Sequence, residues 1–410
     1  MTRPKIHQVL ATLGYGDAIG NEVLGIQRAL TRAGFESDIF VQTADRRLEH
    51  LTREYPDLIQ ASDPSNILIH HFSLGSRASR VAYAVPDRMI LVYHNITPPE
   101  FFLGVHEQLA AECFTGRREL AIYRERVDLA LGDSEFNRQE LESLGFNPTA
   151  VLPVVPDFSH LDVEPNDLIA RELDDEWTNI LFVGRIIPNK RIEDVIRYFH
   201  AYQRTFNKRS RLMLVGSYQG YEKYLATLQQ LVASLGTTNV IFTGHVSNAE
   251  LTAYYEIADL FLCASAHEGF CVPIVEAFYK EIPVVAYAAS AVPATMDGAG
   301  VLFSTTEPIE VAALVDAVLS NDTLYDAIVT RQDEALARLR AKDFDKTLLG
   351  FVDRVLNTPR KPLPPVAWDF WDQLKLSEEL FELQQYRPAI FQALPPAPGS
   401  TAGIVTEKKS

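Results

Sequence analysis

Cysteine is scarce in this chain of 410 residues, and its scarcity excludes two kinds of protein. The three cysteines, Cys113, Cys263 and Cys271, form no CxxC pair and no metal-ligand cluster. Their odd number argues against the disulfide framework of a small secreted protein. The sequence therefore predicts neither a cysteine-based metal site nor a fold held together by disulfides.

Positive charge is also in short supply, because 54 Asp and Glu residues outnumber 38 Lys and Arg residues and the net charge is −16. This excludes a nucleic-acid partner, since nothing supplies the basic surface that a phosphate backbone requires. No apolar run approaches the ~20 residues of a membrane-spanning helix. The N-terminus MTRPKIHQ lacks the apolar region of a signal peptide. We therefore expect a cytoplasmic protein without a membrane span.

What the chain does have is material for a core, because hydrophobic residues make up 47% of it, enough for two domains. Short β-branched apolar runs alternate with amphipathic stretches, which is typical of a buried parallel sheet. This pattern predicts an α/β fold of two Rossmann-like doubly wound domains with a ligand cleft between them. The predicted parts are an N-terminal domain at 1–160, a linker at 161–177, a C-terminal domain at 178–356, and a proline-rich connector, docking helix and disordered tail at 357–410.

A glycine-rich turn follows the first apolar run. In ATLGYGDAIGNEV, Gly14, Gly16 and Gly20 are spaced G-x-G-x-x-x-G, close to the fingerprint of a dinucleotide-binding turn. Asp45 lies about as far downstream as the ribose-binding acid of such folds. One interpretation is therefore an NAD-dependent oxidoreductase, although it leaves the second half of the chain unexplained.

The most specific motif is ASAHEGFCVPIVEAFYKEIPVVAY at 264–287. Pro273 fits the start of a helix, and Gly269 permits a tight turn and close approach of a ligand. Backbone N–H groups at the start of that helix suit a pyrophosphate. Glu268 on the loop and Glu276 inside the helix can then reach hydroxyl groups near the phosphate, one on a ribose and one on a sugar. These backbone N–H groups would belong to Cys271, Val272 and Ile274.

This motif resembles the donor site of the retaining glycosyltransferase family 4, whose fold is called GT-B. ILFVGRIIPNKRIEDVI is similar to the family's strand that ends in Gly-Arg and precedes a helix with Lys. LMLVGS and IFTGHVSNAELTAYYEIADLFLCAS match its next strands, so the resemblance runs from about Ile180 to Phe303. In the first half, LVYHNI, LALGDSEFNRQEL and VLPVVPD look like family positions, whereas the glycine loop departs from the common Gly-Gly pair.

The resemblance implies a role for each matching residue. Glu276 would bind the ribose hydroxyls of a nucleotide, and Glu268 the region of the donor sugar's 3-hydroxyl. Arg185 and Lys190 would stabilise the negative charge that grows on the diphosphate. His94, in YHNIT, matches a strand-end histidine that faces the donor sugar. The other donor contacts would come from Gly16, Gly216, Ser217, His245, Val246, Gly269, Phe270, Cys271 and Val272.

The acceptor site is expected in the first half of the chain. Its candidates are Asp17 and Asn21, where the glycine loop departs from the family, and His70 and His71 in ILIHHF. The one D-x-D sequence, Asp343–Asp345, precedes a helical stretch and is interpreted as a helix cap. Because cations and a helix N-terminus already face the phosphates, we expect no metal and no cofactor.

The sequence therefore predicts a retaining, metal-independent hexosyltransferase of polysaccharide biosynthesis. The resemblance implies a nucleotide diphosphate sugar, with a UDP-glucose type as the family's common choice, and a hydroxyl acceptor such as a growing polysaccharide or lipid-linked oligosaccharide. Such an acceptor would bring the protein to the inner face of a membrane. No obvious carboxylate nucleophile is present, which favours front-face substitution over double displacement. The alternatives are a nucleotide-sugar epimerase, the NAD-dependent oxidoreductase and an inactive sugar-binding protein.

Overall fold

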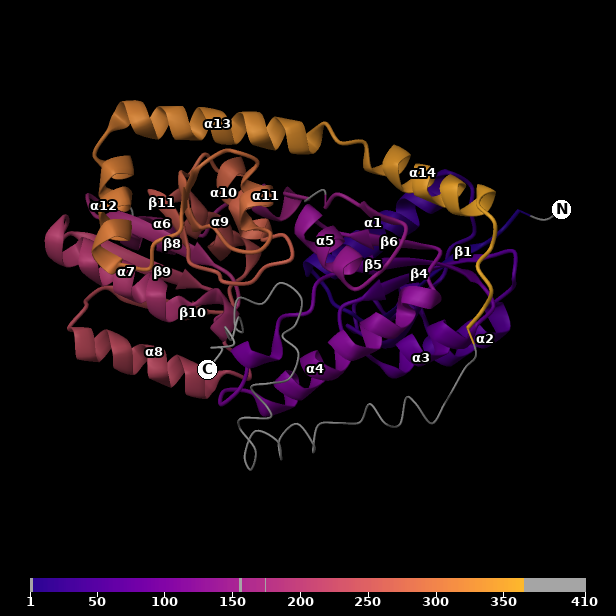
Figure 1. The fold of residues 1–410 in the computed structure, drawn as a ribbon. Coiled ribbons are helices and arrows are strands. Elements are labelled where there is room, and N and C mark those ends of the chain that lie inside the picture. Colours follow the sequence, from indigo (N-terminus) through magenta and orange to yellow (C-terminus); the bar gives the residue numbers. More distant parts are fainter. Residues whose placement is uncertain (1–2, 155–156, 174, 365–410) are drawn as a thin grey trace, which may run out of the picture. The chain divides into compact units, whose positions relative to one another are not determined.

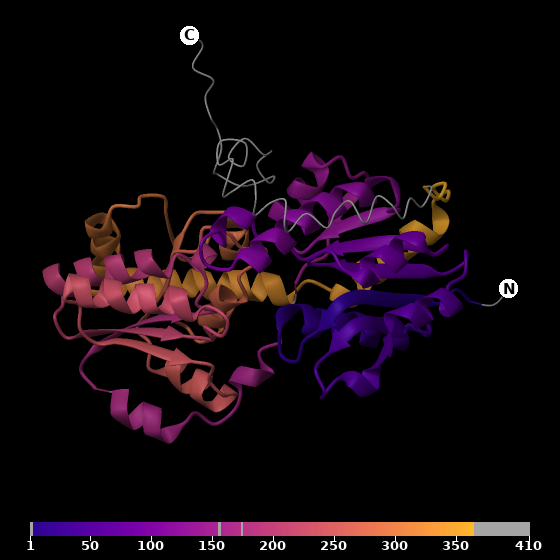
Figure 2. The ribbon, with the colours of Figure 1, turned by 90° about the horizontal axis from the view of Figure 1, so that it is seen from below.

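The computed structural model of the chain describes residues 3–154, 157–173 and 175–364 (Figure 1). These residues form two compact units, the first from 3–154 with 343–364 and the second from 157–342. Each unit is built on one parallel sheet flanked by helices (Figures 1 and 2). The prediction of two Rossmann-like doubly wound α/β domains is therefore confirmed.

The sheet of the first unit has seven parallel strands in the order β3-β2-β1-β4-β5-β6-β7. The order reverses between β1 and β4, the switch point at which such sheets bind ligands. The strands are β1 Ile6–Leu13, β2 Ile39–Ala44, β3 Thr52–Glu54, β4 Ile67–Phe72, β5 Arg88–Tyr93, β6 Leu129–Gly132 and β7 Thr149–Val151. The helices are α1 Ala18–Arg32, α2 Leu58–Ala61, α3 Arg77–Ala84, α4 Glu107–Ile122, α5 Glu135–Ser143 and α14 Phe344–Asn357.

The sheet of the second unit has six parallel strands in the order β10-β9-β8-β11-β12-β13, with its switch point between β8 and β11. The strands are β8 Thr178–Val183, β9 Ser210–Val215, β10 Val240–Gly244, β11 Leu260–Cys263, β12 Val284–Tyr287 and β13 Val301–Phe303. The helices are α6 Asp167–Leu173, α7 Ile192–Thr205, α8 Glu222–Leu235, α9 Asn248–Glu256, α10 Val272–Tyr279, α11 Val292–Met296, α12 Pro308–Leu319 and α13 Asp322–Arg340.

The last described helix, α14, packs in the first unit. Leu348 and Val352 of α14 are buried in the same core as Ile26 and Leu30 of α1. The sequence analysis assigned residues up to 356 to the C-terminal domain, whereas the structure places 343–356 in the first unit. The difference has a simple cause: the apolar face of an amphipathic helix does not specify which sheet it will cover.

The structure describes most of the predicted linker but not the predicted docking helix and tail. Residues 161–177 include α6, which packs against α9, and Leu161, which is buried in the core of the second unit. The predicted docking helix and disordered tail lie at 365–410, outside the described residues. Asp343 caps α14 as predicted, because its carboxylate accepts a hydrogen bond of 2.9 Å from the Lys346 N–H.

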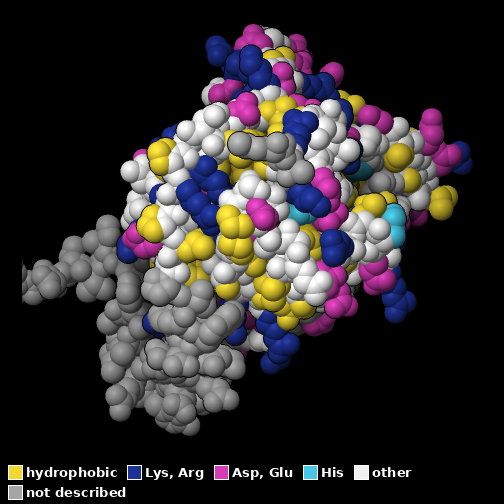
Figure 3. Space-filling model, turned by 90° about the vertical axis from the view of Figure 1, so that its right-hand side faces the viewer, with side chains coloured by type: hydrophobic (Ala, Val, Ile, Leu, Met, Phe, Trp, Pro, Cys, Tyr) yellow, Lys and Arg dark blue, Asp and Glu magenta, His cyan; other side chains and the backbone are white. Residues whose placement is uncertain are grey.

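Among the described residues, no helix combines the length and apolarity needed to cross a membrane. On the face drawn in Figure 3, basic and acidic side chains are interspersed.

Candidate functional site

Helix α10 of the second unit begins where the motif predicts a helix, and no side chain caps its N-terminus. Cys271, the residue before it, has a φ of 76° and makes no side-chain capping bond. Pro273 lies in the first turn, where its missing N–H costs no hydrogen bond. The helix end thus carries partial positive charge and N–H groups that no side chain caps, which suits an anion such as pyrophosphate.

Lys190 and Glu268, both predicted site residues, form an ion pair at this end of the second unit. Lys190 Nζ lies 2.5 Å from Glu268 Oε1, and the two side chains are only 17% and 8% exposed. Burial acts to lower the pKa of Lys190, but the Glu268 carboxylate, together with the Cys271 and Cys263 thiols, raises it above its ordinary value. The ammonium therefore keeps its charge in a largely water-excluded place, where electrostatic interactions are stronger than in bulk water.

Three further hydrogen bonds fix the loop that carries Glu268. The Glu268 N–H donates to Ser290 Oγ at 2.8 Å. The side-chain amide of Asn189 donates to the His267 carbonyl at 3.0 Å, and the Asn189 carbonyl accepts from the Ala266 N–H at 2.9 Å. The loop is thus tied to the segment that holds Lys190. Sequence reasoning missed Asn189 and Ser290, whose residue types are common in ordinary loops.

Glu276 is held by two residues that the sequence analysis did not single out. The Tyr255 hydroxyl donates to its Oε2 at 2.8 Å, and His160 Nε2 lies 2.9 Å from its Oε1. The hydrogen bond to Glu276 raises the pKa of His160, while burial and the same carboxylate raise the pKa of Tyr255 well above its usual value. His160 precedes Glu276 by 116 residues, so no local spacing could have revealed this contact.

The ends of β8, β9 and β10 approach each other closely at glycines. A Cβ on Gly216 would lie 2.0 Å from the carbonyl oxygen of Gly184, and Gly216 has a φ of 148°. Gly216 also bridges to Gly244 at the end of β10. The predicted donor residues Ser217, His245 and Val246 follow these strand ends, so the structure brings them to one edge of the sheet.

Arg185 also lies at this edge, two residues after the end of β8. Its side chain is exposed, and its guanidinium carbon lies 5.5 Å from the centroid of the Tyr221 ring. Unlike Lys190, Arg185 is therefore placed to move toward a ligand rather than held in a buried pair. Gly269 and Phe270 lie in the loop before α10, where the Thr295 hydroxyl donates to the Phe270 carbonyl.

In the first unit, the glycine turn between β1 and α1 forms as predicted. Gly16 has a φ of 74°, which favours glycine. A Cβ on Gly20 would lie 2.2 Å from the Gly14 carbonyl oxygen, so Gly20 permits close packing of helix on turn. Asp17 is the N-cap of α1 and accepts from the Gly20 N–H at 2.6 Å, while Asn21 is exposed in the first turn.

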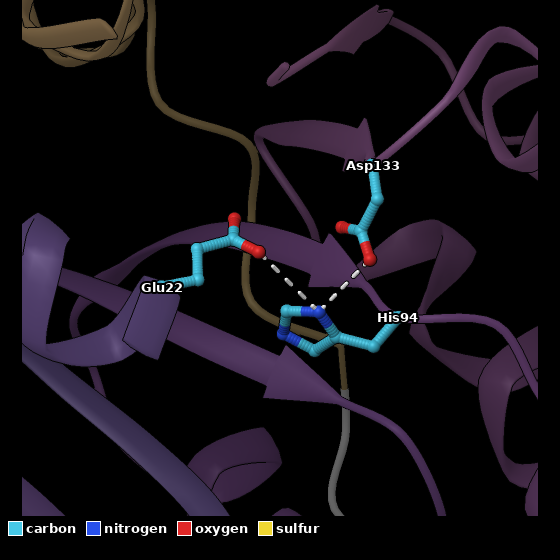
Figure 4. A group of neighbouring side chains, drawn as sticks. All are labelled: Glu22, His94 and Asp133. Atoms are coloured by element: carbon cyan, nitrogen blue, oxygen red, sulfur yellow. Dashed lines mark hydrogen bonds and ion pairs between the residues drawn. The ribbon is translucent and has the colours of Figure 1, made fainter. Parts of the chain in front are cut away.

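Beside this turn lies a chain of buried polar side chains that includes His94 and His71. His94 Nδ1 is 3.1 Å from Asp133 Oδ2 and 3.8 Å from Glu22 Oε2 (Figure 4). His94 Nε2 is 2.9 Å from His71 Nδ1, and His71 Nε2 is 2.9 Å from Gln8 Oε1. Both ring nitrogens of His94 are therefore occupied within the unit, which sequence reasoning did not anticipate.

The charges in this chain of side chains shift its pKa values in opposite directions. Burial alone would lower the pKa of His94, but Asp133, with Glu22 and Asp17, raises it to about 9. Burial and Asp133 raise the pKa of Glu22 to about 8. Burial and the neighbouring His94 hold the pKa of His71 well below its usual value. At neutral pH His94 is thus charged while Glu22 and His71 are neutral.

The same three groups could in principle accept a metal ion. One ligand-type atom each of Glu22, His94 and Asp133 lies within 4.8 Å of the others. The distance of 3.1 Å between His94 and Asp133 is that of an ordinary N–H···O hydrogen bond, which a proton on Nδ1 explains. The geometry therefore fits a hydrogen-bonded ion pair between His94 and Asp133.

His70, the other predicted acceptor residue of β4, points to the opposite face of the sheet from His71, because side chains alternate along a strand. Its ring packs at 5.0 Å from Tyr123 and 5.3 Å from Phe72. Burial and the neighbouring Arg126 lower its pKa to about 3. The structure thus does not bring His70 and His71 together at one site.

Comparison with known proteins identifies related sequences mainly in the second unit. The family model described as "Glycosyl transferases group 1" matches residues 166–334. The alpha-monoglucosyldiacylglycerol synthase of Acholeplasma laidlawii is 36% identical over 112 residues, 27% of each chain. The serotype-specific mannosyltransferase WbdA of Escherichia coli is 27% identical over 256 residues, which is 59% of this chain and 30% of that protein. The matched segments thus span about a third or less of these relatives.

Solved structures match most of the chain at low sequence identity. Sucrose-phosphate synthase from Thermosynechococcus elongatus aligns with a TM-score of 0.67 and 17% identity, covering 86% of this chain and 99% of that one. HepE of Anabaena, solved in complex with UDP-glucose, aligns with a TM-score of 0.66 and 17% identity, covering 85% and 99%. This likeness shows the fold, and the predicted GT-B architecture is confirmed.

Proposed function

Residues 166–334 belong to the glycosyl transferases group 1 family, and from this premise we propose that the protein is a retaining hexosyltransferase. Its donor is a nucleotide diphosphate sugar, and its acceptor is a hydroxyl group. The observation that carries the proposal is the buried Lys190–Glu268 pair, with Glu268 on the loop that leads to the uncapped N-terminus of α10. A fixed cation and a helix N-terminus are what a diphosphate leaving group requires.

Each half of the donor has matching groups in the second unit. The N-terminus of α10, Lys190 and the exposed Arg185 serve the diphosphate. Glu276, oriented by Tyr255 and His160, serves the ribose hydroxyls. Glu268 holds Lys190 through one oxygen, which leaves the other for a hydroxyl of the donor sugar. We take UDP and a glucose-type hexose as the donor, supported by the UDP-glucose complex of HepE, which has the same fold.

The proposed acceptor is a saccharide hydroxyl on a growing polysaccharide or a lipid-linked oligosaccharide. Support comes from the similarity to a serotype-specific mannosyltransferase and to an alpha-monoglucosyldiacylglycerol synthase, the second of which is named for a glucosylated lipid. The acceptor groups proposed for this chain are those at the glycine turn of the first unit, above all Asp17 and Asn21. A lipid-linked acceptor would require contact with the inner face of a membrane.

Retention of configuration is proposed to follow from a front-face substitution. The bond between the anomeric carbon and the departing phosphate oxygen breaks while the acceptor oxygen bonds to the same face of that carbon. The acceptor proton passes to the departing phosphate oxygen. Lys190 and Arg185 stabilise the charge that develops on the diphosphate, and this electrostatic role requires neither a metal nor a cofactor.

The test is to measure sugar transfer and donor hydrolysis for Lys190→Met and Glu268→Gln with a panel of UDP-, GDP- and ADP-hexoses. We expect turnover to fall about 100-fold or more in each variant, as for removal of a transition-state charge contact. Lys280→Met is the matched control, because the Lys280 side chain is likewise 17% exposed and pairs with one carboxylate, Glu256, at 3.5 Å. Activity near wild type in both site variants would disprove the assignment.

Two simpler measurements separate the alternatives. Thermal stabilisation by NADH but not by UDP would favour the oxidoreductase. Conversion of the donor sugar to its epimer in the absence of any acceptor would favour the epimerase. A protein that binds UDP-hexose but neither transfers nor hydrolyses it would be a sugar-binding protein. We expect stabilisation by UDP and transfer only when a hydroxyl acceptor is present.

A further inference from the structure

Four strands and one helix of the first unit each contribute one side chain to a buried polar chain. Gln8 comes from β1, His71 from β4, His94 from the end of β5, Asp133 from the end of β6 and Glu22 from α1. Gln8 is fully buried and His71 is only 2% exposed. Such groups are costly to bury unless they are hydrogen-bonded, so their arrangement requires a reason.

A hydrogen bond to the backbone of α1 fixes which side-chain atom of Gln8 is the donor and which is the acceptor. The side-chain amide of Gln8 donates from Nε2 to the carbonyl of Val23 at 3.1 Å. Its other atom, Oε1, is therefore an acceptor, and His71 Nε2 at 2.9 Å must carry a hydrogen. A neutral His71 with hydrogen on Nε2 has a lone pair on Nδ1. His71 thus presents an acceptor to the next residue.

That acceptor decides the protonation of His94. His94 Nε2 lies 2.9 Å from His71 Nδ1, so it must donate its hydrogen there. The two rings are inclined by only 7° and their centroids are 5.1 Å apart, as expected for two rings joined edge to edge by an in-plane hydrogen bond. The opposite nitrogen, Nδ1, faces the Asp133 carboxylate at 3.1 Å and donates to it. With hydrogen on both nitrogens, His94 is an imidazolium.

We propose that Gln8 and His71 are positioning residues that hold His94 as a buried imidazolium with both N–H groups used inside the unit. His94 then serves the proposed sugar transfer, on which this inference rests, as a fixed positive charge and not as a hydrogen-bond donor to the sugar. The polar atoms left over are Glu22 Oε1 and Asp133 Oδ1, which have no hydrogen-bond partner within the described residues.

The titratable groups around His94 are consistent with this protonation state. Asp133 and Glu22 face His94 Nδ1 at 3.1 and 3.8 Å, and Asp17, the cap of α1, adds a third nearby carboxylate. The other titratable groups near His94 are His71 and, on the opposite face of the sheet, His70. Both are buried, and the pKa of each is lowered. At neutral pH the Asp133 and Asp17 carboxylates favour the cation on His94, and the neutral Glu22 and histidines do not oppose it.

The direct test is nitrogen-15 NMR of the histidine rings in the full chain. We expect His94 to show two protonated nitrogens at pH 7, and His71 to show one protonated and one unprotonated nitrogen. In His71→Leu the acceptor for His94 Nε2–H is lost, so His94 should lose its proton at a pH about one unit or more below wild type. In His71→Asn the side-chain oxygen can take the place of Nδ1, and the wild-type titration should return.

The functional readout is the pH profile of kcat/KM for transfer. We expect a plateau through neutral pH with an alkaline limb that moves to lower pH in His71→Leu and Gln8→Leu and returns in His71→Asn. His7→Asn is the control, since His7 neighbours Gln8 on β1 but packs against Phe40 on the other face. A purely structural role would lower activity at all pH values without moving the limb.

Three outcomes would overturn the inference. One is a neutral His94 ring at pH 7 in the wild-type spectrum. Another is an alkaline limb that stays in place when His71 is replaced by leucine. The third is stoichiometric binding of Zn²⁺ or Mn²⁺ that disappears in His94→Gln, because a metal would occupy the place of the Nδ1 proton. The NMR result is independent of activity, so it stands or falls separately from the proposed transfer reaction.

Discussion

At the scale of single residues, the surroundings of buried Glu22 in the first unit differ from those of Glu268 and Glu276 in the second unit. In the second unit, Glu268 and Glu276 each meet a donor, the Lys190 ammonium and the Tyr255 hydroxyl. In the first unit, Glu22 Oε1 meets no donor among the described residues, and Glu22 Oε2 lies 3.8 Å from His94 Nδ1. Glu268 and Glu276 are therefore each held by a hydrogen-bond donor, whereas burial and Asp133 raise the pKa of Glu22 to about 8 and favour its protonated form.

Replacing Glu22 by glutamine tests this difference through the pH dependence of stability. The folded pKa of Glu22, about 8, lies above the ordinary value of 4.5, so the folded protein holds this proton more tightly than the unfolded chain. Its contribution to stability is present below pH 4.5 and is lost as pH rises through 8. Glutamine resembles the protonated acid at every pH. We expect Glu22→Gln to unfold like wild type at pH 5 and at a higher temperature at pH 8.5.

Calorimetry at the two pH values provides the measurement, with Glu250→Gln as the comparison. Glu250 lies in the exposed capping box of α9, where hydrogen bonds from the Ser247 backbone and side chain lower its pKa. Its replacement should therefore cost stability at both pH values. Equal effects of Glu22→Gln at pH 5 and 8.5 would mean that Glu22 is ionised throughout.

A site residue could be predicted from the sequence when it lies near a recognisable strand end, and could not when a distant segment of the chain brings it to the site. Glu268, Glu276 and Lys190 follow recognisable strand ends, so the sequence places them at one edge of a parallel sheet. Tyr255 and His160 contact Glu276 only because the chain folds back from another helix and from the segment before α6. No spacing along the chain encodes such a contact, and the buried chain from Gln8 to Asp133 was hidden for the same reason.

At the scale of elements, the ends of β8 and β9 are packed so closely that only glycine fits between them. Gly216 combines a φ of 148° with a Cβ position 2.0 Å from the Gly184 carbonyl oxygen. Gly220, four residues later, has a φ of 82° but open space around its Cβ position. The two glycines thus separate the cost of backbone conformation from the cost of crowding.

We expect Gly216→Ala to destabilise the protein by about 3 kcal/mol or more and Gly220→Ala by about 1 kcal/mol. The difference arises because the alanine methyl group at 216 must push two strand ends apart, whereas at 220 only the left-handed conformation is penalised. Urea unfolding of the two variants measures both values. Equal costs would show that the strands can separate at little expense.

The parallel sheets themselves were predictable, because each buried strand is a short β-branched run between amphipathic stretches. Which sheet a helix covers was not, as α14 shows. Its apolar face would suit either unit, and its partners Ile26 and Leu30 lie more than 300 residues earlier in the chain. The local sequence pattern therefore predicts that α14 is a helix, whereas tertiary packing determines which sheet the helix covers.

At the scale of the whole molecule, the core of the first unit is completed by a helix from the far end of the described chain. Leu348 of α14 is fully buried in that core. We expect Leu348→Ala to cost about 2–5 kcal/mol, the range for large cavities in a core. Ile309→Ala, on the exposed surface of α12, should change stability by no more than about 0.5 kcal/mol.

Hydrogen exchange resolved by strand shows where the loss falls. In Leu348→Ala the amides of β4 and β5 should exchange faster, while those of β8 and β9 keep their protection. An equal loss of protection in both sheets would contradict the assignment of α14 to the first unit.

Because α14 packs in the first unit, the order of synthesis also constrains the order in which the two units fold on the ribosome. The first 154 residues emerge early, yet their core lacks its last helix until roughly 200 more residues have been made. At translation rates of ~5–20 residues per second, that interval is about 10 to 40 s. The second unit is one contiguous segment that ends at 342, so its synthesis is finished within this interval. The half of the chain that is synthesised first should therefore be the last to reach its native state, and during that interval it is the half most in need of a chaperone.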